Sequence, residues 1–266
     1  MKPQQSRFLY LGLPIDPLTK KNVLDKIKKY LSEDPSFHHI VSINPENIVI
    51  AQKNLEYRHV CDNADLALTD GIGVIMGTKI IGKNIPERIS GSKLLPELLD
   101  LAGAISSRVV LIGSQANLAD KIAKCYSQSY PKATFIGING YQNKQKPTHE
   151  EERHIEDIVR ATRPHFVFVA FGSPFQEIWI DTHRTLFKGS ICMGVGGAFN
   201  YLSGLSRKPP DVISRFGLEW IYRLFSEPWR MGRQLTRLPY FVVLVFKEWI
   251  WCIMHPQNEK APPYCS

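Results

Sequence analysis

The chain has 266 residues, of which 44% are hydrophobic. It can therefore fill the core of one large domain, and its composition excludes an intrinsically disordered chain. Its formal net charge of +8 favours an anionic partner, which could be a phosphorylated small molecule, an acidic membrane surface or a nucleic acid. The five cysteines are odd in number and lack CxxC or Cys/His ligand spacing, which predicts reduced thiols in a cytosolic protein.

Neither a signal peptide nor a membrane span is expected. The N-terminal stretch MKPQQSRFLYLGLPID has no apolar run of the necessary length. The longest apolar stretch, from Tyr240 to Met254, contains Lys247 and Glu248 and is shorter than the roughly 20 residues that a spanning helix needs. A helix that lies in the membrane interface stays open as an interpretation.

Runs rich in β-branched residues alternate with amphipathic stretches as far as about residue 198. This alternation is typical of βαβ units and predicts an α/β fold over residues 1–200: a Rossmann-like, mainly parallel sheet with helices on both faces. The predicted strands are 39–43, 66–69, 109–113, 134–138, 166–172 and 191–197. The predicted helices are 46–62, 92–105, 117–129, 149–163 and 175–187, with Asn117 and Thr148 as candidate N-caps.

The alternation stops after residue 200, where basic residues stand among large apolar ones. Arg230, Arg233 and Arg237 are three and four residues apart and share one helical face, which predicts a helical C-terminal appendage over residues 201–255. An ordinary helix packed on the core, with its arginines solvated, would give the same pattern.

Aromatic residues in the appendage favour a lipid surface over that ordinary packing. Trp229, Trp249 and Trp251 place interface-seeking side chains beside the cations, as anionic head groups would require. The remaining stretch, 256–266, is polar and contains prolines, and we expect it to be a flexible tail.

Ligands of parallel α/β sheets bind beyond the carboxyl ends of the strands, so polar residues and glycines directly after each strand are candidate site residues. These residues are Asn44, Glu46, Asp70, Gly71, Ser114, Gln115, Tyr141, Ser173, Gln176, Gly196 and Gly197.

The stretch DGIGVIMG (70–77) resembles a dinucleotide-binding turn, but Met76 stands where the last glycine of GxGxxG belongs. A tight turn with closely packed glycines explains it equally well. Asp70 at its start could cap the following helix or act in catalysis, and the sequence leaves both open.

Three further stretches have capping or turn interpretations beside functional ones. In NPENI, Asn44 and Pro45 are typical of a helix start. In GSPFQE, Ser173 and Gln176 have capping-box spacing. The glycines of GVGGAF could admit a phosphate or a sugar, or could simply form a turn. HExxH, GxSxG and DxD patterns are absent, so a departing diphosphate would need arginines or helix N-termini.

Six stretches in order, SINPENIV, ADLALTDGIGV, ERISGS, FGSPFQE, GVGGAFNYLSG and GLEWIYRLFSEPWR, resemble the WecG/TagA/CpsF family of glycosyltransferases. The resemblance runs from about residue 8 to about residue 241. It implies an inverting, metal-independent enzyme that moves a sugar from a UDP-sugar, typically UDP-N-acetylmannosamine or its uronic acid, to an undecaprenyl-diphosphate-linked sugar in cell-surface polysaccharide or teichoic acid synthesis. It further implies a cytoplasmic protein, peripheral on the inner face of the membrane, with self-association possible and no nucleic-acid partner.

The resemblance also implies residue roles. Asp70 is the general base, Arg88 steadies the diphosphate, and Ser42 and Gln176 complete the catalytic set. The implied substrate-binding residues are Asn44, Tyr141, Gly196, Gly197 and Asn200, with Arg223, Arg230 and Arg233 of the appendage. The chain departs from the family pattern at Ser42 (usually threonine), Phe175 (often lysine) and Asn200 (usually aspartate, whose charge is lost here).

Two other classes of protein compete with the transferase. A degenerate glycine turn could serve an NAD(P)-dependent oxidoreductase, but no acidic residue that would grip the ribose follows the next strand. A nucleic-acid binder built on the basic tail is disfavoured because its cations alternate with large apolar residues. A family member without activity stays open because of Asn200.

Overall fold

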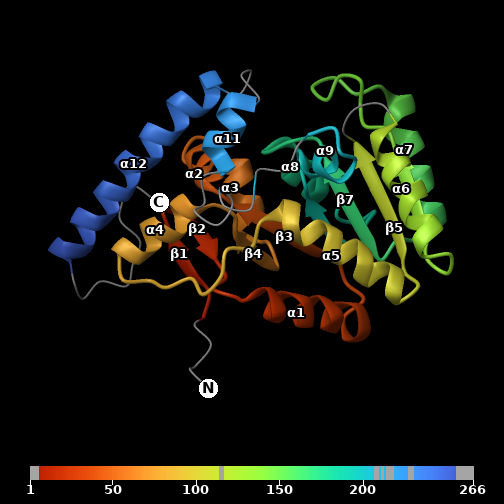
Figure 1. Ribbon diagram of the computed structural model, residues 1–266, viewed down its shortest axis with the longest axis horizontal. Helices are drawn as coiled ribbons and strands as arrows, with labels where there is room; N and C mark the ends of the chain where they lie inside the picture. Colours follow the sequence, from red (N-terminus) through yellow and green to blue (C-terminus); the bar gives the residue numbers. More distant parts are fainter. Residues whose placement is uncertain are drawn as a thin grey trace.

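The computed structural model describes residues 6–113, 117–206, 210, 213, 219–226 and 231–255. Within these residues lies a six-stranded parallel sheet in the order β4-β3-β8-β7-β5-β6, with helices on both faces (Figure 1). This confirms the predicted fold class. The strands are β3 (His38–Ile43), β4 (Leu66–Thr69), β5 (Arg108–Gly113), β6 (Thr134–Ile138), β7 (Phe166–Ala170) and β8 (Ile191–Gly194).

Alternating side chains of each strand enter different cores, which is why the strands read as nearly continuous apolar runs. Ile40 packs in the core on one face, and its neighbour Val41 packs in a core on the other. The first face is covered by α1 (Lys20–Glu33), α5 (Gly91–Ala104), α6 (Leu118–Ser129) and α9 (Ala198–Leu202). The second is covered by α2 (Pro45–Ala51), α3 (Leu55–Asp62), α4 (Ile72–Ile80), α7 (His149–Thr162) and α8 (Phe175–Thr182).

All six predicted strands are present, but β7 ends at Ala170 and β8 at Gly194, before the predicted ends at 172 and 197. The predicted helix 175–187 likewise ends early, at Thr182, and the predicted helix 46–62 is wrong. Residues 46–62 form two helices, because the Asn54 side chain accepts the N–H of Tyr57 at 2.8 Å and starts α3 anew. Thr148 caps α7 in a capping box, as predicted. Asn117 precedes α6 in a left-handed conformation and makes no side-chain cap.

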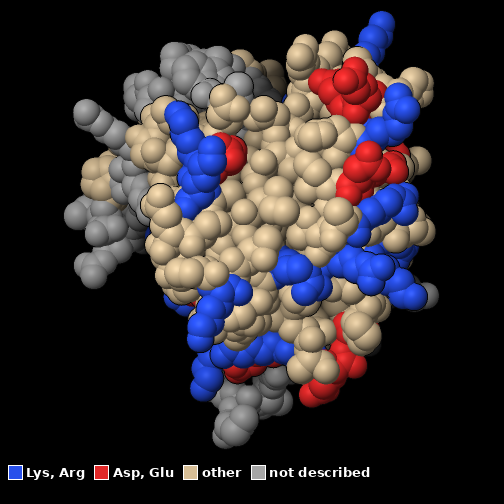
Figure 2. Space-filling model, turned by 90° about the vertical axis from the view of Figure 1, so that its right-hand side faces the viewer, with Lys and Arg blue, Asp and Glu red and all other residues tan. Residues whose placement is uncertain are grey.

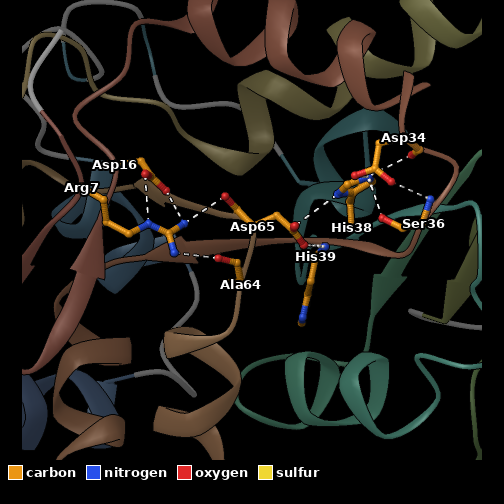
Figure 3. A network of polar contacts seen from close by, with 8 residues as sticks. All are labelled: Arg7, Asp16, Asp34, Ser36, His38, His39, Ala64 and Asp65. Atoms are coloured by element: carbon orange, nitrogen blue, oxygen red, sulfur yellow. Dashed lines mark hydrogen bonds and ion pairs between the residues drawn. The ribbon is translucent and has the colours of Figure 1, made fainter. Parts of the chain in front are cut away.

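A short antiparallel hairpin, β1 (Phe8–Tyr10) and β2 (Leu13–Ile15), was not predicted and is fastened to the sheet by a polar network (Figure 3). Arg7 donates from Nε and Nη2 to the two carboxylate oxygens of Asp16, at 3.1 and 2.7 Å. The Arg7 guanidinium also reaches the carbonyl oxygens of Ala64 and Asp65, and Asp16 accepts the N–H of Ala67 at the start of β4. The hairpin is thereby held at the end of β4 opposite to its carboxyl end.

The C-terminal helix α12 (Met231–Met254) lies along α2 and beside α4 and α11 (Glu219–Ser226) (Figure 1). Two glycines of α4 make room for it. A Cβ atom at Gly73 would lie 3.4 Å from the Phe241 ring, and one at Gly77 would lie 3.3 Å from Val245 and 2.0 Å from the Tyr10 hydroxyl. Gly73 and Gly77 are four residues apart on α4, as Phe241 and Val245 are on α12, so the small and large side chains face each other at two successive turns. This lets α4 and α12 approach closely.

The outer face of α12 is apolar and exposed. Nowhere in the described ranges is a helix long and apolar enough to cross a membrane. The predicted flexible tail, 256–266, lies outside the described residues, and the predicted boundaries near residues 200 and 255 stay predictions. The exposed apolar side chains of α12 are Leu235, Tyr240, Val242, Val243, Phe246, Trp249, Ile250, Ile253 and Met254.

The inner face of α12 carries one acid. Glu248 is only 5% exposed, and its Oε2 has no hydrogen-bond partner within the described part of the chain. Burial raises the pKa of the Glu248 carboxyl to about 7, and the Glu248 charge adds to the burial that raises the pKa of Tyr10.

Charged residues of both signs lie on the end of the molecule formed by α6 and α7, around a broad uncharged centre (Figure 2). The net positive charge of the chain is therefore not gathered into a uniformly basic surface on this face.

We expect Asp16→Asn to lower the free energy of unfolding by about 2–3 kcal/mol, because the new amide would turn hydrogens toward Arg7 or the Ala67 N–H. Urea denaturation at pH 7 measures the change. Glu33→Gln, which removes an exposed ion pair with Lys29, is the control and should change stability by less than about 0.5 kcal/mol. Equal effects of the two substitutions would contradict this account of the hairpin.

We expect Glu248→Gln to flatten the pH dependence of stability. The folded-state pKa of Glu248 is raised to about 7, so the folded protein binds the extra proton between the ordinary carboxyl range and pH 7. Wild-type stability therefore falls as pH rises through that window. Between pH 4 and pH 8, the free energy of unfolding of the wild type should fall by about 1–3 kcal/mol more than that of the variant. Urea midpoints at several pH values test this, and a constant difference would count against it.

Candidate functional site

A cavity of about 800 Å³ opens at the carboxyl ends of β4, β3, β8 and β7, under the appendage helices α11 and α12. Its volume falls in the range of small-molecule sites. Ten of the predicted site residues line it: Ser42, Asn44, Glu46, Asp70, Gly71, Arg88, Ser173, Gln176, Gly196 and Gly197.

Asp70 stands in the turn between β4 and α4. Its N–H bonds to the carbonyl oxygen of Ile43, and its Oδ2 accepts the N–H of Gly91, at the start of α5, at 3.4 Å. The N-cap of α4 is Gly71, not Asp70. Gly71 has a φ of +128°, and a Cβ atom there would lie 3.2 Å from Pro45, so glycine is required. The N-cap position predicted for Asp70 is thus occupied by Gly71.

Two polar side chains of β3 and α2 stand beside Asp70. The Ser42 hydroxyl is buried and has no hydrogen-bond partner within the described ranges. A Cβ atom at Gly91 would lie 3.4 Å from that hydroxyl, so the backbone at the start of α5 approaches it closely. Asn44 caps α2 by accepting the N–H of Asn47 at 3.0 Å, which confirms the capping interpretation while leaving Asn44 on the cavity wall.

Two ion pairs join the α/β domain to the appendage. In one the appendage supplies the carboxylate, and in the other it supplies the guanidinium group. Arg88 donates to Glu219 of α11 at 2.8 Å, and both side chains are largely buried, at 15% and 14% exposure. Arg237 of α12 donates to Glu46 of α2 at 3.3 Å. These four residues all line the cavity, so its rim offers guanidinium groups that are already oriented by carboxylates.

Gln176 does not belong to a capping box, so that interpretation of GSPFQE is wrong. The N-cap of α8 is Pro174, and it makes no side-chain cap. Gln176 is instead buried, and its Oε1 accepts the N–H groups of Gly172 and Gly196, both at 3.0 Å. The side chain thus bridges the turns that follow β7 and β8.

A comparison with known proteins identifies the chain's relatives. The model of the glycosyl transferase WecG/TagA/CpsF family matches residues 8–253. The chain belongs to this family. A protein of Bacillus spizizenii is 37% identical over 85% of this chain and 82% of its own, and one of Bacillus subtilis is 33% identical over 85% of each. A Staphylococcus aureus protein is 28% identical over 89% of this chain and 91% of its own. All three are named N-acetylglucosaminyldiphosphoundecaprenol N-acetyl-beta-D-mannosaminyltransferase.

The family match confirms the resemblance and a glycosyltransferase activity, and it does not support the oxidoreductase alternative. Other parts of the protein lie against the glycines that suggested a dinucleotide turn. Gly71 and Gly73 face Pro45, and Gly73 and Gly77 also face α12. Within the described part of the chain, no three His, Cys, Asp or Glu side chains gather in a way that could hold a metal ion.

Two residues that the family resemblance assigned to the nucleotide do not line the cavity, namely Tyr141 and Asn200. The Tyr141 hydroxyl accepts the indole N–H of Trp179 at 2.8 Å, its ring stacks on Phe171, and burial raises its pKa to about 12. Asn200 lies on α9, and its carbonyl oxygen accepts the N–H of Ser206. Their roles stay predictions.

The structure describes the three arginines assigned to the appendage only in part. Arg230 lies outside the described residues. For Arg223 and Arg233 the structure gives only their places in α11 and α12. Ser114 and Gln115, predicted to follow β5, also lie outside the described residues.

Several cavity residues were missed as site residues from the sequence. Arg237 shares the helical face of the predicted arginines, so its periodicity was a usable signal. Lys144, which donates to the carbonyl oxygen of Phe171 at 3.1 Å, gave no such signal. No sequence pattern marked Glu177, Glu219 or Trp220 either; their place on the cavity wall is seen only in the folded structure.

Proposed function

We propose that the protein transfers N-acetylmannosamine from its UDP derivative to undecaprenyl-diphosphate-linked N-acetylglucosamine, for cell-surface polysaccharide or teichoic acid synthesis. The observation that carries this proposal is the relationship to the Bacillus spizizenii enzyme of that name, at 37% identity over most of both chains. The cavity supports it, since a carboxylate and a guanidinium group stand on its wall together.

In the proposed reaction the acceptor hydroxyl oxygen attacks the anomeric carbon of the donor sugar from the face opposite the UDP group. The bond between that carbon and the diphosphate oxygen breaks, which inverts the configuration. The Asp70 carboxylate takes the hydroxyl proton as general base. Ser42 and Asn44 lie beside Asp70 on the cavity wall and are assigned to the sugar.

The departing UDP carries the negative charge that develops in the transition state. We assign its stabilisation to Arg88, assisted by Arg237 and by the appendage arginines Arg223, Arg230 and Arg233. Guanidinium groups match diphosphate oxygens in geometry and stay charged at every relevant pH. The reaction therefore needs no metal ion in this proposal.

We place the protein in the cytoplasm, peripheral on the inner leaflet, with the exposed apolar face of α12 in the lipid interface. This face runs from Val243 to Met254, whereas the exposed residues Leu235 and Val242 line the cavity. The inner face of α12 packs on α2 and α4. A lipid-linked acceptor would then reach the cavity directly from the membrane. Association of two subunits through the same face is the competing arrangement.

We expect Asp70→Asn to lower kcat by about 10²–10⁴-fold with little change in KM for the donor, because the base is lost while the cavity is kept. Mass spectrometry of a short-prenyl-diphosphate-N-acetylglucosamine acceptor incubated with a panel of UDP-sugars measures the product. Asp157→Asn, an exposed change on α7, is the control. The metal-free mechanism requires the product to survive EDTA, and full activity of Asp70→Asn would remove the general-base assignment.

We expect the combined change Val243→Ser, Phe246→Ser and Ile250→Ser to reduce flotation with vesicles containing anionic lipid by at least about fivefold, because the side chains that would enter the lipid are lost. Turnover of the water-soluble short-prenyl acceptor should persist. Leu55→Ser, at a more exposed apolar site on α3, is the control. Unchanged flotation together with a smaller sedimentation coefficient would assign the face to a second subunit instead.

A further inference from the structure

Glu177 is a buried acid that no step of the proposed transfer uses. It is 1% exposed, lies next to Gln176 on α8 and contributes to the cavity wall. A carboxylate in such a place has lost its water, and burial raises the pKa of Glu177. Its hydrogen bonds indicate what the carboxylate does there.

One carboxylate oxygen of Glu177 holds the side chain of Gln176. Glu177 Oε1 accepts from Gln176 Nε2 at 2.7 Å and from the Ser173 hydroxyl at 2.7 Å. Glu177 Oε1 is the acceptor in both bonds, and it stays an acceptor in the neutral acid when the proton is on Oε2. The Gln176 amide must therefore turn its NH₂ group toward Glu177 and its oxygen the other way.

The oxygen of that oriented amide joins two turns of the cavity wall. Gln176 Oε1 accepts the N–H groups of Gly172 and Gly196, which have φ values of +84° and +49°. A Cβ atom at Gly194 would lie 2.6 Å from Gln176 Nε2, so β8 ends in a glycine where the amide crosses it. The reversed amide would direct its hydrogens at two backbone N–H groups.

The other side of Glu177 gives no competing explanation. Its Oε2 accepts no hydrogen bond from the described residues. The nearby Tyr57 hydroxyl is bonded to Asn47, and the Glu177 charge contributes to the raised pKa values of Tyr57 and Cys61. The carboxylate therefore acts in this structure through Oε1.

We propose that Glu177 is a positioning residue of the active site: it fixes the direction of the Gln176 amide, and Gln176 in turn holds the turns after β7 and β8 in the shape that binds substrate. The link to substrate rests on the proposed function, whereas the link to the two turns does not.

The experiment compares Glu177→Met, which keeps the length of the side chain but accepts no such bond, with Glu177→Gln, which keeps an acceptor oxygen. We expect Glu177→Met to lower kcat/KM by about 10–100-fold and Glu177→Gln to stay within about fivefold of the wild type. Asp181→Asn on the same helix is the control. Equal losses in the Met and Gln variants would overturn the proposal.

A double substitution tests whether Glu177 acts through Gln176. If it does, adding Glu177→Met to Gln176→Ala should lower kcat/KM no further than Gln176→Ala alone, within about twofold. Independent, multiplied losses would overturn the proposal, because Glu177 would then act on something else.

Amide hydrogen exchange in ¹⁵N-glycine-labelled protein supplies a readout that needs no activity. In Glu177→Met the Gly172 and Gly196 amides should exchange at least about tenfold faster, with Gly103 of α5 unchanged as the internal reference. Protected Gly172 and Gly196 amides would overturn the proposal. If the two amides exchange faster in Glu177→Met but the wild-type protein transfers no sugar, the proposed function is refuted. The role of Glu177 in positioning the turns is then still supported.

Discussion

The parallel register of four strands is the constraint on which the site depends. Ile43 pairs with Thr69, Ile40 with Met193, and Val169 with Gly194, so β4, β3, β8 and β7 end at one edge of the sheet. Residues more than 100 positions apart in the chain, such as Asp70 and Gln176, reach one cavity only because these ends are aligned. The network around Arg7 and Asp16 lies at the opposite ends of the strands and serves the fold.

The appendage turns an open sheet edge into a cavity. Its docking rests on shape, through Gly73 and Gly77 of α4, and on charge, through the pairs of Arg88 with Glu219 and Arg237 with Glu46. Buried ion pairs add little net stability but require a defined geometry, since a misplaced partner leaves a desolvated charge. The two pairs therefore favour one placement of α11 and α12 over other placements that would bury a similar apolar area.

Strand positions were predictable because buried parallel strands are runs of β-branched and aromatic residues, as in 166–170. Asp70 and Gln176 were found by one topological rule, that ligands meet strand ends. The β1–β2 hairpin was missed because its strands have three residues each, too few for a periodic signal. Glu219 was missed because its pairing with Arg88 spans 131 positions in the chain, which no local pattern encodes.

The glycines show most clearly where sequence reasoning stops. DGIGVIMG and GVGGAF both suggested backbone exposed to a phosphate, and both lie at the cavity edge of the sheet. The structure separates them by their neighbours: Gly73 and Gly77 face Pro45, Tyr10 and α12, whereas Gly194 and Gly196 surround the Gln176 amide. Glycines of both motifs line the cavity, namely Gly71, Gly73, Gly194 and Gly196. A glycine motif specifies only that something approaches the backbone. Whether that is a helix, a side chain or a ligand is decided by chain segments outside the motif. Pro45 and Phe241 lie against Gly73, and Gln176 lies against Gly194, so the start of α4 resembles a cofactor turn in sequence alone.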